Sequence, residues 1–160
     1  MKFAYAMGLA GFIAACSPQP AAEATPAAEA ATPARHRESG LAVVPLTVTT
    51  ATGTHRFQVE VAATPAEQQK GLMFRTAMGP NEGMIFPNTP PQVRSFWMKN
   101  TVIPLDIIYI GPHRRVLNIV RGEPYSTVSL PSAGPVINVL ELAAGRSAEL
   151  GIKPGDAVAW

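Results

Sequence analysis

The sequence contains one cysteine, Cys16, among its 160 residues. A single thiol cannot form an internal disulfide and cannot build a cysteine-based zinc site. Charged residues are also scarce, at 15%, and the 13 Lys and Arg nearly balance the 11 Asp and Glu. A nucleic-acid-binding protein usually carries a clustered basic face. We therefore expect no nucleic-acid partner, and a chain of this length fits one domain.

No apolar run in the sequence reaches the roughly 20 residues that a membrane-spanning helix needs. The run from Phe3 to Ala15 has 13 residues and follows Met1-Lys2, which suits the core of a signal peptide. It ends in Ile13-Ala14-Ala15-Cys16, which resembles the lipobox of bacterial lipoproteins. The resemblance implies a signal peptide over residues 1–16 and lipidation of Cys16. The alternative is an ordinary signal peptide that is cleaved and discarded.

Proline and alanine dominate the next segment, residues 17–40. Because this composition offers nothing to bury in a core, the segment is predicted to be a flexible spacer. Residues 41–160 then form the single domain. With the lipidated Cys16 ahead of the spacer, we expect a domain anchored in the membrane of the cell envelope, on the periplasmic side. Ser17 after the lipobox favours the outer membrane over the inner one.

The sequence of residues 41–160 predicts short strands separated by turns. Apolar residues alternate with polar ones over Leu46 to Thr50 and over Phe57 to Ala62, with Thr52-Gly53 as a hairpin turn between them. Further strands are predicted at 84–86, 96–98, 105–110, 116–120, 136–142 and 157–160. The pattern predicts a mainly β, mixed α+β domain: small, compact and β-barrel-like, with one or two short helices.

One helix start stands out in the sequence Thr64-Pro65-Ala66-Glu67. Thr64 can cap the free amides, Pro65 occupies a position that needs no donor, and Glu67 completes a capping box. Gly71 is a natural stop, so the helix should have about two turns. A second helical turn is predicted at 147–150.

The stretch from Arg94 to Tyr109 carries the most unusual composition. Asp106 begins a run that is otherwise apolar, and a desolvated carboxylate needs a partner. If residues 96–98 form a hairpin with 105–110, one register brings Asn100 to Asp106 and the other brings Lys99. The sequence leaves both registers open.

The segments Phe96-Trp97-Met98-Lys99-Asn100-Thr101 and Ile103-Pro104-Leu105-Asp106-Ile107-Ile108 resemble the signature of the DUF192 family, also called UPF0127. Gln68 to Arg75, Gly83 to Phe86, Val139 to Glu141, Gly145 and Gly155-Asp156 match in the same order. The resemblance implies a small mixed-β, barrel-like domain in proteins that are often exported. It implies no particular activity.

Five residues suggest a binding groove: Arg75, Trp97, Lys99, Asn100 and Asp106. Tryptophan offers a flat apolar face, and Lys, Arg and Asn donate hydrogen bonds to carboxylate, phosphate or hydroxyl groups. We therefore predict a binding or accessory domain that takes a small polar ligand or an envelope component, without cofactor or metal.

Three other functions remain open. A hydrolase-like enzyme would use Asp106 as general base, assisted by Glu141 or Lys99. A Cu(I)-binding protein would use thioethers from the sequence's methionines, with imidazoles beside them; the residues concerned are Met73, Met78, Met84, Met98, His55 and His113. A purely structural envelope module would bind nothing and catalyse nothing.

Overall fold

The computed structural model describes residues 1, 2, 4 and 34–160. The predicted lipidation site Cys16, most of the predicted signal peptide and most of the predicted spacer lie outside the described residues. Within the part that is described, no helix combines the length and the apolar character needed to cross a membrane.

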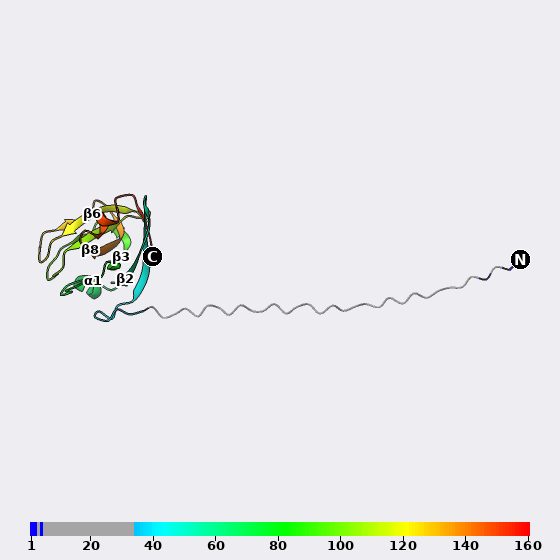
Figure 1. Cartoon of the computed structure of the whole chain (residues 1–160), viewed down its shortest axis with the longest axis horizontal. Coiled ribbons are helices and arrows are strands. Elements are labelled where there is room, and N and C mark those ends of the chain that lie inside the picture. The colour runs from blue at the N-terminus through cyan, green and yellow to red at the C-terminus, as the bar shows by residue number, and fades with distance from the viewer. Residues whose placement is uncertain (3, 5–33) are drawn as a thin grey trace. The chain divides into compact units, whose positions relative to one another are not determined.

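Seven strands form one sheet in the order β6-β5-β8-β3-β2-β1-β9, and β4 and β7 form a separate two-stranded sheet (Figure 1). The prediction of a mainly β domain with two short helices is confirmed. The elements are β1 (Val43–Thr50), β2 (Gly53–Val61), α1 (Pro65–Lys70), β3 (Glu82–Gln92), β4 (Ser95–Phe96), β5 (Leu105–Ile110), β6 (Val116–Gly122), β7 (Leu130–Pro131), β8 (Val136–Ala143), α2 (Arg146–Glu149) and β9 (Ala157–Ala159).

The expected barrel does not close. The two edges of the large sheet meet only at the start of β6 among the described residues, through the isolated bridge between Arg115 and Ala157. Three backbone hydrogen bonds accompany this bridge: Val116 N to Asp156 O, Gly155 N to Val116 O, and Val158 N to Arg114 O. The edge strand β9 has three residues, whereas β6 has seven, so the edges cannot pair along their length. The domain is therefore an open sheet with short helices.

A crossover places α1 beside the sheet. β1 and β2 form the predicted antiparallel hairpin, but β2 and β3 run parallel, with Val59 opposite Gly83. Parallel neighbours need a connection that returns the chain to the starting edge, and residues 62–81, which include α1, supply it. The predicted capping box at its start is confirmed: Glu67 N donates to Thr64 Oγ1, and Thr64 N donates to Glu67 Oε2.

The sheet is buried on both faces, because successive side chains of a strand point to opposite sides. The first face holds one apolar cluster, which includes Phe57, Ile85, Ile108, Leu140 and Leu142. The second face holds another, covered by the segments around α1 and Trp97; it includes Leu72, Met84, Phe86, Met98, Ile107, Tyr109 and Val139.

The hairpin expected between residues 96–98 and 105–110 is wrong. β4 pairs with β7, and Asp106 of β5 stands opposite Arg121 on one side and Leu142 on the other. After β4, Met98 N donates a hydrogen bond to Ser126 O. Thr101 N then donates to Met98 O, which closes a bend in the chain. Asn100 takes a left-handed conformation (φ 58°) in this bend, so neither proposed register exists.

Candidate functional site

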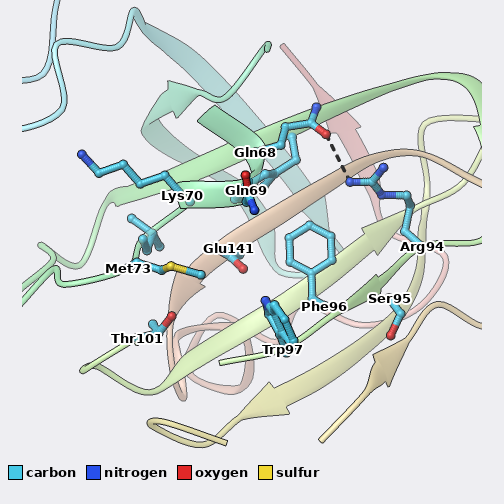
Figure 2. A pocket seen from close by; sticks show the side chains of 13 residues that line it. Gln68, Gln69, Lys70, Met73, Arg94, Ser95, Phe96, Trp97, Thr101 and Glu141 are labelled. Carbon is cyan, nitrogen blue, oxygen red and sulfur yellow. Dashed lines mark hydrogen bonds between the residues drawn. The ribbon is translucent and has the colours of Figure 1, made fainter. Parts of the chain in front are cut away.

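Two connected hollows open over the second face of the sheet, between α1 and the segment 94–101. The inner hollow has a volume of about 120 Å³ and the outer hollow about 390 Å³. Gln69, Lys70, Met73 and Trp97 line both. Figure 2 shows the inner hollow, with Glu141 between Met73 and Phe96 and with Trp97 below it in this view. Thr101 and the bent segment after α1 complete its wall.

Glu141 forms the floor of the inner hollow. It lies on β8 between Met84 of β3 and Ile107 of β5, and both neighbours are fully buried. The residue is 4% exposed, and its carboxyl group forms no hydrogen bond or ion pair with any described residue. Burial alone raises the pKa of Glu141 to about 8. The carboxyl is therefore mostly protonated at neutral pH, in a site that faces a cavity.

The rim carries positive charge and aromatic surface. Lys70 extends from the end of α1 (Figure 2). Lys99 lines the outer hollow. Lys99 Nζ lies 5.4 Å from the centroid of the Trp97 ring, a cation–π distance. Trp97 is 51% exposed although it is the largest apolar side chain at the rim. This combination is typical of a site for a ligand with a flat face and an anionic group.

Aromatic packing fixes the inner wall. The Phe96 ring meets Phe86 edge to face, with centroids 5.0 Å apart, and meets Tyr109 at 6.2 Å. Arg94 passes 5.9 Å from the Phe96 centroid, and its Nη2 donates to Gln68 Oε1 at 3.1 Å. Burial and the nearby Glu141 charge raise the pKa of the Tyr109 phenol. The wall is thus held by contacts within the domain.

The outer rim is fixed by backbone contacts between two strained turns. Phe74 N donates to Asn100 O at 2.8 Å, and both residues have positive φ, 65° and 58°. Asn100 Nδ2 also approaches Met73 Sδ at 4.0 Å. Left-handed conformations of large residues are unfavourable and tend to occur at functional sites. These turns hold Trp97, Lys99 and Asn100 against the segment that follows α1.

Arg75 lies near this region, but its guanidinium forms ion pairs with carboxylates of the protein itself. Its guanidinium donates to both carboxylate oxygens of Glu60, at 2.9 and 3.1 Å, and its Nε contacts Glu38 Oε2 at 2.8 Å. Ser39 Oγ also donates to Glu60. Arg75 borders a third hollow of about 260 Å³, which shares Lys70 and Met73 with the inner one. Residues 36–39, the end of the predicted spacer, are thereby bound to the domain.

Asp106 lies on the other face of the sheet. Its carboxylate accepts hydrogen bonds from Gly145 N at 3.1 Å and Ser147 N at 2.9 Å, at the start of α2. Its register partner is Leu142, whereas Glu141 is the register partner of Ile107. Because neighbouring strand positions face opposite sides, Asp106 and Glu141 cannot act on one substrate as an acid–base pair.

The structure thus brings together three of the five predicted site residues: Trp97, Lys99 and Asn100. Arg75 borders the adjoining hollow, and Asp106 lines none of the three hollows. Of the other residues that line them, the sequence analysis named Glu141 only as an assisting residue of the enzyme hypothesis and Met73 only as a candidate copper ligand. It assigned no site function to Gln69 and Lys70. A glutamate inside an otherwise apolar strand was the one signal that could have identified Glu141.

The candidate ligands of the Cu(I) hypothesis lie in different parts of the domain. Met84 and Met98 are fully buried in the second cluster, and Met73 lines the hollows. His113 is exposed in the turn before β6, and His55 lies in β2. Over residues 34–160, no group of three or more His, Cys, Asp and Glu side chains is placed to hold a metal ion.

The chain belongs to the DUF192 family, described as Uncharacterized ACR, whose model matches residues 47–160. A crystal structure of a protein of unknown function from Novosphingobium aromaticivorans is similar at 57% identity, with a TM-score of 0.79, over 86% of this chain and 99% of that one. A Sinorhizobium meliloti protein described as a proposed transcription regulator is similar at 37% identity and a TM-score of 0.72, over 74% of this chain and 94% of that one. No curated protein matches the chain.

Proposed function

We propose that this protein is an exported, lipid-anchored binding domain of the cell envelope whose ligand occupies the hollows between α1 and the segment 94–101. A small polar ligand would place a flat face against Trp97 and polar groups near Lys70 and Lys99. A hydrogen-bonding group would reach Glu141 at the floor.

One observation carries the binding proposal: Glu141 is a buried carboxyl group without a hydrogen-bond partner among the described residues, and it lines a cavity. Ser147 Oγ is the one fully enclosed polar side-chain atom without a partner among the described residues, so the Glu141 oxygens are open to the hollow. A ligand in the hollow would supply the hydrogen bond that the protein does not. The exposed Trp97 and the lysines at the rim support the same interpretation.

The binding test uses the fluorescence of Trp97. The sequence has two tryptophans, so Trp160→Phe in the full chain leaves Trp97 as the sole indole. The panel should contain neutral sugars, sugar acids, sugar phosphates, aromatic acids and amines. We expect at least one class to change the emission saturably and to raise the melting temperature.

Trp97→Ala should abolish the rise in melting temperature while leaving the unliganded melting temperature nearly unchanged, because the ring is half exposed. Trp160→Phe is the matched control, and its own melting temperature should still rise with the ligand. If no member of the panel alters the emission, or if Trp97→Ala still responds, the binding proposal is wrong.

The anchoring proposal rests on the apolar run from Phe3 to Ala15 and on Cys16 after it. The test expresses the full chain in a Gram-negative host with labelled palmitate. We expect label in the membrane fraction, and Cys16→Ser should remove the label while the chain is still exported. Unlabelled wild-type protein would contradict the lipid anchor but leave the binding proposal intact.

A further inference from the structure

We propose that the ligand is a small anion that enters the site with its neutral end first, so that a hydroxyl, carbonyl or ether oxygen accepts a hydrogen bond from Glu141 while its carboxylate or phosphate stays at Lys70 and Lys99. This inference deepens the proposed function and rests on it.

The floor of the site favours a neutral hydrogen-bond acceptor. Met84 and Ile107 flank Glu141 and offer no donor to an ionised carboxylate. The protonated carboxyl can instead donate its O–H to a ligand oxygen. An anionic group at the floor would lose its hydration beside the apolar Met84 and Ile107, so such a group should stay at the rim.

The rim favours negative charge. Lys70 and Lys99 line the outer hollow, and Arg94 lines the inner one. Among residues 34–160, no Asp or Glu other than Glu141 lines either hollow. A cationic ligand would have to pass these three positive groups and then ionise Glu141. An anionic ligand meets complementary charge at the rim and leaves the floor neutral.

The titratable and charged groups near Glu141 come from several elements of the fold. Tyr109 of β5 shares its face of the sheet, and Lys70 comes from the end of α1. Arg94 lies between β3 and β4, and Lys99 follows β4. β3 contributes the uncharged Met84 at the register position of Glu141. The phenol of Tyr109 donates to Leu130 O and has a raised pKa, so it stays neutral up to pH 9.

The charge test compares three sugars with one ring: glucuronate, glucose and protonated glucosamine, all at pH 6 with the Trp160→Phe chain. We expect glucuronate to bind at least tenfold more tightly than glucose, and glucosamine to bind most weakly. Lys70→Gln combined with Lys99→Gln should remove the preference for glucuronate but retain glucose binding. Lys153→Gln, which changes an exposed lysine in the turn before β9, is the matched control.

The proton test follows glucuronate binding from pH 6 to pH 9. Because the pKa of Glu141 is about 8, only about a tenth of the carboxyl groups remain protonated at pH 9, and affinity should fall about tenfold. The ligand's own carboxylate stays ionised throughout, since an exposed carboxyl titrates near pH 4. Glu141→Gln keeps an N–H donor, so it should bind glucuronate with no such decrease.

The outcomes separate this inference from the proposed function. If none of the three sugars and no other member of the panel binds, both fail. If glucosamine binds most tightly, or if affinity for glucuronate rises with pH, a binding site exists but the inference is wrong. A decrease of affinity with pH that persists in Glu141→Gln would also overturn it.

Discussion

Asp106 and Glu141 lie on neighbouring strands, one register position apart, and their carboxyl groups face opposite sides of the sheet. Asp106 accepts two backbone hydrogen bonds at the start of α2, whereas Glu141 has no hydrogen-bond partner among residues 34–160. The two carboxyl groups therefore have different surroundings. Asp106 stabilises a turn of the fold, and Glu141 faces the inner hollow.

The stability of the unliganded protein should decrease as the pH rises from about 4.5 to 8. In this window Glu141 ionises in the unfolded chain but stays protonated in the folded one, since its folded pKa is raised from 4.5 to about 8. The ionisation of Glu141 should contribute at most about 1 kcal/mol per pH unit to this decrease. Urea unfolding at pH 5, 6.5 and 8 measures it.

Glu141→Gln should remove this decrease, so that the variant gains stability relative to wild type between pH 5 and 8. Glu123→Gln, at an exposed site, is the control and should keep the wild-type slope. An unchanged slope in Glu141→Gln would assign the pH dependence to other groups.

Asp106→Ala should destabilise the domain without weakening ligand binding. The substitution leaves the amides of Gly145 and Ser147 without their acceptor in a region where Asp106 is 6% exposed. The expected loss is about 2 kcal/mol or more in urea unfolding. The Trp97 emission titration then reports binding in the variant. Lost binding with an unchanged urea midpoint would instead place Asp106 in the ligand site, as the sequence analysis predicted.

Arg75→Ala should be strongly destabilising, by about 3–5 kcal/mol, because it leaves the buried carboxylate of Glu60 unpaired. The double variant Arg75→Met with Glu60→Leu should recover most of this loss, since neither charge is then left alone. Arg121→Ala is the control: its ion pair with Glu123 is more than half exposed, and its loss should cost less than about 1 kcal/mol. Equal losses for Arg75→Ala and Arg121→Ala in urea unfolding would contradict a structural function for Arg75.

Thr64→Ala should weaken both stability and binding. The hydroxyl of Thr64 caps α1, and its removal costs about 1 kcal/mol in similar caps. Because α1 carries Gln69 and Lys70 to the hollow, fraying of the helix should also lower ligand affinity. Thr64→Ser keeps the cap and should restore both measurements. Full affinity in Thr64→Ala would show that the site does not depend on the helix start.

Local patterns in the sequence predicted the elements well. Alternation identified β1 and β2, and the residues Thr64 to Glu67 predicted the capping box in detail, because each of these signals lies within a few neighbouring residues. The two-residue strand β7 had no such signal. The parallel pairing of β2 with β3 also escaped prediction, since no local pattern specifies which distant strand lies alongside.

The site was harder to predict because its partners are distant in sequence. Asp106 finds its hydrogen-bond donors about 40 positions away, and Arg75 finds Glu60 and Glu38 instead of a ligand. Trp97, Lys99 and Asn100 line the outer hollow together because one short turn carries all three. The face on which Glu141 lies depends on the register of β8, which only the folded sheet defines.

Residues 36–39 contact the domain at the border of the third hollow, where Glu38 and Ser39 share a wall with Lys70 and Met73. The same segment is also attached directly to the start of β1: Ala34 O accepts from Val43 N at 2.6 Å, and Arg35 forms an isolated bridge with Ala42. Removal of residues 34–39 would therefore take away part of the wall of the third hollow and leave Arg75 without its contact to Glu38.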